Sequence, residues 1–119
     1  LSQPGQGFGQ LEVFETVELG GRDYLLFNCT APDMSLDRRA REGHGAVWLA
    51  PADSPLGPYD IAGAQILADR RHYVGRLVTD RSGQVVFLAF RHEDERGHFV
   101  GGVIDPLPVR VENGLVVIG

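Results

Sequence analysis

The chain contains a single cysteine, Cys29, which excludes an internal disulfide framework and favours a buried free thiol. It contains no apolar run long enough to span a membrane, and its first residues, LSQPGQGFG, lack the charged-then-apolar order of a signal peptide. Positive charge is also scarce, because 11 Lys and Arg against 16 Asp and Glu give a net charge of −5. We therefore expect a soluble chain with neither nucleic acid nor a membrane as partner, in a compartment that the composition does not indicate.

The length and composition fit one compact domain. With 119 residues, of which 43% are hydrophobic, the chain can bury a modest core but is too short for two domains. Apolar and polar residues alternate along most of the chain, and turn residues separate the alternating runs. We therefore interpret residues 1–119 as a single all-β domain. The expected strands are Leu11–Leu19, Tyr24–Cys29, His44–Ala50, His72–Thr79, Gln84–Arg91, Phe99–Ile104 and a closing hairpin, VRVENGLVVI.

Glycine-containing turns and polar loops connect these strands. Gly20-Gly21 and Asn113-Gly114 tolerate the positive φ of tight hairpin turns, and DRSG, residues 80–83, suits a bulged hairpin loop. Residues 30–43, TAPDMSLDRRAREG, predict a long exposed loop, with a short helix as the alternative. Short strands at about ten-residue spacing are typical of a sandwich, a barrel or a propeller. Periodicity alone does not choose among these three architectures.

Four segments share their order and residue types with one enzyme family. In LEVFETVELGGRDYLLF, residues 11–27, a glutamate precedes Glu-Leu-Gly-Gly and an aromatic-aliphatic strand. SPLGPYD, residues 54–60, has the pattern Ser-x-x-Gly-Pro-aromatic. A strand, turn and strand follow in HYVGRLVTDRSGQVVFLAF, residues 72–90, and DPLPVRVENGLVV, residues 105–117, forms a closing hairpin. Together these segments resemble glycoside hydrolase family 32, the β-fructosidases, and the second is also similar to families 43 and 68.

The resemblance implies a five-bladed β-propeller built from antiparallel four-stranded blades. The innermost strand of each blade would deliver residues to an active site at the mouth of the central axis. Glu12 falls at the position of the family's acid/base glutamate, and a carbohydrate is the implied substrate. Retaining glycosidases use two carboxyl groups about 5 to 5.5 Å apart, one as nucleophile and the other as proton donor. Glu12 would be the proton donor.

The family's other catalytic motifs do not occur in the sequence. Its nucleophile lies in an Asn-Asp-Pro-type motif and a second aspartate in an Arg-Asp-Pro motif, whereas the sole Asp-Pro here is Asp105-Pro106. The chain therefore looks like the last three-fifths of a propeller, beginning just before the acid/base blade. We expect it to be inactive alone, and to be a fragment of a larger enzyme, a chain that assembles with a separate N-terminal propeller part, or a shortened descendant that has lost catalysis. The exposed blade faces of a partial propeller would also favour self-association.

Other candidate residues are aromatic side chains and histidines. Tyr73, in a segment that matches the family, is the better candidate for contacting a sugar, and Trp48 and His44 are the others, although core packing or capping also explains them. We interpret Glu15 and Glu18 as solvent-facing. HEDERGH, residues 92–98, places two histidines around three acids, which suggests a metal loop, but a solvated turn explains the spacing better. We expect no metal and no cofactor.

Two functions of other classes stay open. A carbohydrate-binding module of the β-sandwich type would also be all-β, acidic and rich in turns, and it would need no nucleophile. Its signature would be an exposed row of aromatic residues, and the chain has only one tryptophan and three tyrosines, in separate segments. A small structural domain whose only partner is another copy of itself is the third alternative.

Overall fold

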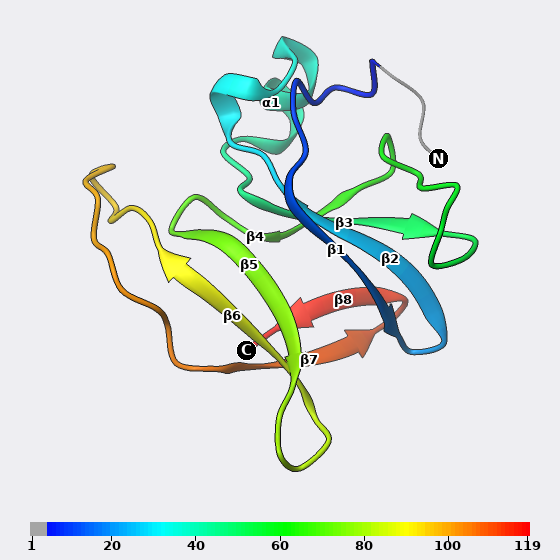
Figure 1. The fold of residues 1–119 in the computed structure, drawn as a ribbon. Coiled ribbons are helices and arrows are strands. Elements are labelled where there is room, and N and C mark those ends of the chain that lie inside the picture. Colours follow the sequence, from blue (N-terminus) through cyan, green and yellow to red (C-terminus); the bar gives the residue numbers. More distant parts are fainter. Residues whose placement is uncertain (1–4) are drawn as a thin grey trace.

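The chain forms two antiparallel β-sheets of four strands each, and a short helical segment lies between the second and third strands (Figure 1). The computed structural model describes residues 5–119. In both sheets the strands neighbour one another in chain order, so each sheet is an up-and-down meander. The first sheet contains β1 (Glu12–Leu19), β2 (Arg22–Asn28), β3 (Val47–Ala52) and β4 (Gln65–Ala68); the second contains β5 (His72–Thr79), β6 (Val85–Arg91), β7 (Leu107–Glu112) and β8 (Leu115–Ile118); the helical segment contains η1 (Ala31–Asp33) and α1 (Leu36–Glu42).

This architecture confirms the all-β prediction and the four-stranded antiparallel sheets. Over the described residues the two sheets do not close into a propeller ring, so the complete propeller stays a prediction. No helix within residues 5–119 has the length and apolar character that a membrane crossing requires.

The three hairpins form where the turn residues predict them. Gly20 and Gly21 both have positive φ, as do Asn113 and Gly114, which matches the two-residue turns that suit twisted strands. In the link between β5 and β6, the Asp80 carboxylate accepts hydrogen bonds from the backbone nitrogens of the residues two and four positions later, at 2.8 and 2.9 Å. Local turn chemistry therefore sets the registers of these strand pairs.

Residues 30–43, predicted as a long exposed loop with a short helix as the alternative, contain η1 and α1, so the helical alternative is confirmed. Ser35 caps α1, because its Oγ accepts a hydrogen bond from the backbone nitrogen of Arg38 at 3.2 Å, and Gly43, with φ of 71°, ends the helix. Arg38 is only 2% exposed, and its guanidinium lies 4.2 Å from the centre of the Phe8 ring. The segment is therefore packed over the first sheet and is not a free loop.

Two other elements differ from the prediction. Phe99–Ile104 does not form a regular strand, although isolated bridges and backbone hydrogen bonds join it to the end of β6 and the residue after it. Gly101 and Gly102 have φ of 85° and 82°, which interrupts the extended chain. β4, a strand of four residues that completes the first sheet beside β3, is not among the strands that the sequence predicts.

Two apolar cores cover the opposite faces of the first sheet. One lies between the two sheets, and the other lies beneath the N-terminal segment and Arg38 of α1. The free thiol of Cys29 belongs to the second core, as predicted. The core between the sheets contains Leu19, Tyr24, Leu26, Val47, Leu49, Leu67, Ala68, Leu77, Phe87, Ala89 and Val116; the other contains Leu25, Phe27, Cys29, Met34, Trp48, Ala50, Ile61 and Ala64.

Candidate functional site

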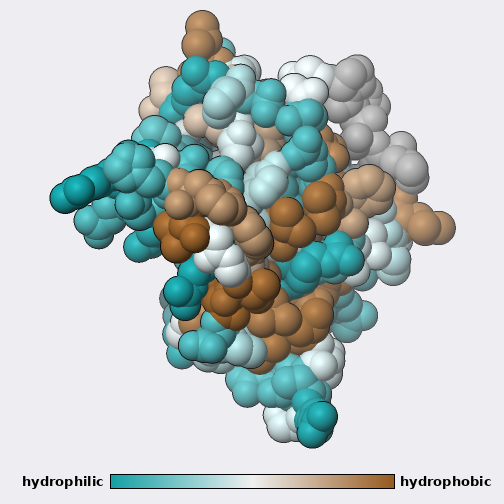
Figure 2. Space-filling view, turned by 60° about the vertical axis from the view of Figure 1, so that its left-hand side comes forward, coloured by the Kyte–Doolittle hydropathy of each residue, from teal (hydrophilic) through white to brown (hydrophobic). Residues whose placement is uncertain are grey.

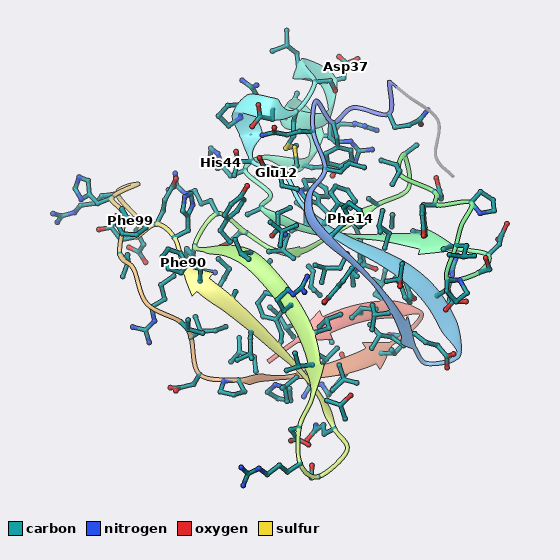
Figure 3. The ribbon with its side chains drawn as sticks, viewed as in Figure 1. Glu12, Phe14, Asp37, His44, Phe90 and Phe99 are labelled. Atoms are coloured by element: carbon teal, nitrogen blue, oxygen red, sulfur yellow. The ribbon has the colours of Figure 1, made fainter. Side chains whose placement is uncertain are left out.

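Glu12 and Tyr73 come from different sheets and meet at the beginning of each sheet's first strand. Glu12 is the first residue of β1, and Tyr73 is the second residue of β5. The Tyr73 hydroxyl donates a hydrogen bond to Oε2 of Glu12. Both residues are half-buried, and Figure 3 shows Glu12 at the end of β1 that lies nearer to α1. The structure thus brings together the predicted acid/base residue and the better of the predicted sugar contacts.

Both first strands contain a β-bulge directly after this pair. The register shifts between Glu12 and Glu15 in β1, and between Tyr73 and Arg76 in β5. Val13 and Val74 therefore adopt φ of 46° and 52°, a region that β-branched residues avoid. Such a backbone costs on the order of 1–3 kcal/mol per residue, and bulges next to functional sites re-aim a side chain. The equivalent bulges orient Glu12 and Tyr73 toward one another.

The buried amide of Asn28 holds both bulges in place. Its Nδ2 donates to the backbone carbonyl oxygens of Glu12 and Val13, at 3.3 and 3.2 Å. Its Oδ1 accepts a hydrogen bond from the backbone nitrogen of Gly75 at 3.1 Å. Asn28 has no exposed surface, so these partners replace the water that its amide would otherwise bind. One side chain in β2 therefore connects the two strands that carry Glu12 and Tyr73.

Glu15 provides a second connection between the sheets. Its Oε1 accepts a hydrogen bond from the backbone nitrogen of Leu77 at 2.7 Å, and its Oε2 lies 3.3 Å from Nε of Arg76. The prediction that Glu15 simply faces solvent was wrong, because β5 lies beside β1 and its backbone needs an acceptor at this point. Glu18, further along β1, is exposed as predicted.

The surroundings of Tyr73 stabilise its protonated form. Partial burial raises the pKa of the Tyr73 hydroxyl, and its hydrogen bond to the nearby negative charge of Glu12 raises it further. His92 lies against the ring, with centroids 5.1 Å apart and planes inclined by 30°. His92 belongs to the loop that we predicted to be solvated, but its side chain is only 29% exposed. Tyr73 is thus the hydrogen-bond donor of the pair, and Glu12 is the acceptor.

We expect the tyrosinate form of Tyr73 to appear at higher pH than in an unperturbed tyrosine. Because folding raises this pKa, the contribution of Tyr73 to stability is fully present below about pH 10, the ordinary tyrosine value, and is lost as the pH rises above it. Glu12→Gln should lower the pKa of Tyr73, since it removes the neighbouring charge. Near-ultraviolet titration measures the pKa of the Tyr73 hydroxyl. Tyr73→Phe identifies the signal of this residue among the tyrosines, and Glu18→Gln is the matched control. An unchanged midpoint in Glu12→Gln would contradict the pairing.

His44 and Trp48 do not join Glu12 and Tyr73. Trp48 is fully buried in the second core, where its Nε1 donates to the backbone oxygen of Cys29 at 2.9 Å. The prediction that Trp48 contacts a sugar is therefore wrong, because the first sheet and the segment above it leave the Trp48 ring no access to a ligand. His44 is exposed and lines an open hollow of about 320 Å³, together with Asp69 and Arg70. Neither Glu12 nor Tyr73 lines this hollow.

The acidic loop around His98 forms a hydrogen-bonded turn. The Asp94 carboxylate accepts hydrogen bonds from the backbone nitrogens of Arg96 and His98, at 2.8 and 2.9 Å. Within residues 5–119 no group of three or more histidine, cysteine, aspartate or glutamate side chains lies close enough to hold a metal ion. The turn explains the spacing of Asp94, Arg96 and His98 in this loop.

Sequence reasoning missed two residues of the site, Asn28 and His92. Asn28 stands at the end of a strand and gives no local signal, because its partners are 15 and 47 residues away in the chain. His92 was assigned to the charged loop, although it directly follows β6, whose end lies beside Tyr73. The pairing of β5 with β6 was predicted, and continuing that register would have placed His92 close to Tyr73.

Comparisons with protein-family models, with curated proteins and with solved structures find no match to this chain. The resemblance to the β-fructosidases therefore stays a prediction.

Proposed function

We propose that this chain is part of a glycoside-processing enzyme and that Glu12 is its proton donor. The observation that supports the proposal is the Glu12–Tyr73 hydrogen bond, formed at equivalent bulges of the first strands of two adjacent sheets. Strained backbone of this kind is concentrated at functional sites. Tyr73 engages Oε2 of Glu12, which leaves Oε1 to approach the oxygen of a leaving group.

The proposed reaction needs a nucleophile that the motifs of this chain do not provide. In a retaining glycosidase a carboxylate attacks the anomeric carbon, the bond from that carbon to the leaving oxygen breaks, and the proton donor protonates the oxygen. Glu12 would supply that proton, and Tyr73 would fix the orientation of its carboxyl group. The nucleophile would come from an N-terminal propeller part, carried on the same or on another polypeptide.

An added nucleophile can test the role of Glu12 in residues 1–119 alone. Azide would attack the anomeric carbon of sucrose, the glycosidic bond would break, and Glu12 would protonate the departing glucose oxygen. We expect no hydrolysis in plain buffer and azide-dependent formation of glycosyl azide. Glu12→Gln should reduce that rate by about 100-fold, since general acids contribute roughly 100- to 10,000-fold.

Two comparisons make this experiment specific. A p-nitrophenyl glycoside has a leaving group that needs little protonation, so Glu12→Gln should leave its azide reaction almost unchanged. Glu18→Gln changes an exposed glutamate of the same strand and should leave both reactions intact. Equal sucrose rates in the parent chain and Glu12→Gln would overturn the proposal.

A non-catalytic, self-associating module is the second candidate. The observation that favours it is the exposed apolar surface formed by Val74 and Val78 of β5 together with the adjoining Val103 (Figure 2). In that case Glu12 and Tyr73 would act only as a connection between the sheets. The chain would then sediment as an oligomer, and no azide product would depend on Glu12.

A further inference from the structure

His92 is placed beside Tyr73 by the pairing of β5 with β6. Tyr73 pairs with Phe90 across the ladder, and Figure 3 shows Phe90 at the end of β6. His92 lies two residues beyond Phe90, and residues two apart along an extended chain point to the same face. A side chain at this diagonal position is within reach of an aromatic residue on the neighbouring strand. The register therefore brings the His92 ring next to the Tyr73 ring.

The backbone of His92 is held on both sides. Its nitrogen donates a hydrogen bond to the carbonyl oxygen of Arg71 at 2.9 Å, and its carbonyl oxygen accepts one from the nitrogen of Val100 at 3.0 Å. Arg71 directly precedes β5 and His92 directly follows β6, so the first bond continues the ladder beyond both strands. The His92 ring is therefore presented from a fixed backbone, although the residues after it form a charged loop.

The His92 side chain contacts Tyr73 by ring stacking. The two ring centres are 5.1 Å apart and the planes are inclined by 30°, within the range of offset stacking between aromatic rings. Nδ1 of His92 is buried, and within residues 5–119 it has no hydrogen-bond partner. Oε1 of Glu93 lies 3.7 Å from it, too far for a hydrogen bond. Stacking, and not a hydrogen bond at Nδ1, therefore holds the imidazole against Tyr73.

The hydroxyl of Tyr73 depends on such a restraint. Val74, the next residue, has φ of 52° and lies in the bulge, where the ladder to β6 is interrupted. A rotation of the Tyr73 side chain about its first bond would move the hydroxyl away from Oε2 of Glu12, its hydrogen-bond acceptor. Both residues are half-buried, so water could replace either partner after such a rotation. A ring packed against the phenol opposes this rotation.

We propose that His92 is a positioning residue for the proton donor Glu12. Its ring, stacked on Tyr73, keeps the Tyr73 hydroxyl on Oε2 of Glu12, which leaves Oε1 available to the leaving group. His92 touches no reacting atom and acts only through Tyr73. The consequence for catalysis rests on the proposed function, whereas the stack and the hydrogen bond can be tested without a substrate.

The exchange rate of the Tyr73 hydroxyl proton tests the positioning without sugar. NMR detects a hydroxyl proton that a hydrogen bond protects from water, and Tyr73→Phe identifies its signal. We expect His92→Ala to speed this exchange at least about tenfold. His92→Phe keeps a ring without nitrogens, and its exchange rate should stay within about twofold of that of the parent chain. His98→Ala, which removes a 73% exposed histidine side chain of the same loop, should leave the exchange rate unchanged.

The azide reaction of sucrose tests the consequence for Glu12. His92→Ala should lower its kcat at least about tenfold and leave KM unchanged, because a misplaced group that acts in the transition state costs rate and not substrate binding. The p-nitrophenyl glycoside needs little protonation, so its azide reaction should be retained in His92→Ala. His92→Phe should recover most of the kcat for sucrose.

Three results would overturn the proposal. An unchanged hydroxyl exchange rate in His92→Ala would show that the stack does not hold Tyr73. Equal effects of His92→Ala and His92→Phe would assign the effect to the imidazole nitrogens. A lower free energy of unfolding in His92→Ala, with faster amide exchange throughout β5 and β6, would indicate a structural role alone. If the parent chain forms no glycosyl azide, the proposed function fails, and the hydroxyl exchange rate still decides whether His92 positions Tyr73.

Discussion

Replacing Asn28 with alanine is expected to lower the free energy of unfolding by about 3 kcal/mol or more. The substitution removes the partners of two backbone carbonyls, those of Glu12 and Val13, and of the Gly75 nitrogen. Each polar group left without a partner in a buried site costs about 1–3 kcal/mol. The two bulges would also lose their common restraint, so the pKa of Tyr73 should fall toward its ordinary value. Chemical denaturation and tyrosine titration measure the two effects.

Asn28→Asp is the matched control for this change. Aspartate keeps an acceptor for the Gly75 nitrogen, but an ionised carboxylate cannot donate to the two carbonyl oxygens. We therefore expect a loss of stability at neutral pH that becomes smaller in acid, where the protonated carboxyl group regains one donor. If Asn28→Ala cost under about 0.5 kcal/mol, as exposed surface substitutions do, the amide would not hold the bulges.

Replacing Arg38 with alanine should lower the free energy of unfolding by about 3 kcal/mol or more, because it empties a buried site and leaves several polar groups without a partner. Nη1 of Arg38 lies 2.9 Å from Oε1 of Glu42, and Nη2 donates to the carbonyl oxygen of Ala62 at 2.7 Å. The guanidinium also lies against the rings of Phe8 and Trp48. Its removal would leave those carbonyl and carboxylate groups without their cation and uncover the second core. Urea denaturation followed by Trp48 fluorescence measures the loss.

Two other arginine changes separate the effect of the charge of Arg38 from that of its side-chain geometry. Arg41→Ala removes an exposed arginine of the same helix and should change stability by less than about 0.5 kcal/mol. Arg38→Lys keeps the charge but loses the planar group that reaches several acceptors, so its cost should lie between those of the two alanine variants. Equal effects of Arg38→Ala and Arg41→Ala would show that the buried guanidinium does not hold the segment in place.

The parts of the fold that depend on local chemistry could be predicted from the sequence. Gly20-Gly21 and Asn113-Gly114 form hairpins because their positive φ is nearly independent of the rest of the chain. The helix α1 also had a local signal, since Ser35 before LDRRARE is an N-cap residue before good helix formers. The dense charge of the segment is equally typical of an exposed loop, so the local signal alone does not decide between loop and helix. Arg38 is nevertheless buried, which depends on Phe8 and Trp48 and has no local signature.

The candidate site depends on contacts between distant segments, and the sequence predicts only part of it. Glu12 and Tyr73 could be singled out by their segments, but their hydrogen bond spans 61 residues. Local preference argues against the bulges, because valine disfavours the positive φ that Val13 and Val74 adopt. They persist because Asn28 binds the backbone of both strands. A residue whose partners all come from another sheet is visible only once the sheets have been packed.

The most direct test of the proposed role of Glu12 is the azide reaction of sucrose, measured for the parent chain and for Glu12→Gln under matched conditions. Circular dichroism would first establish that both proteins are folded to the same extent. We expect glycosyl azide formation by the parent chain and a loss of about 100-fold in Glu12→Gln, with the p-nitrophenyl glycoside reaction retained. Equal rates for the two proteins on sucrose would contradict it, and Glu12 would then serve only to join the two sheets through Tyr73.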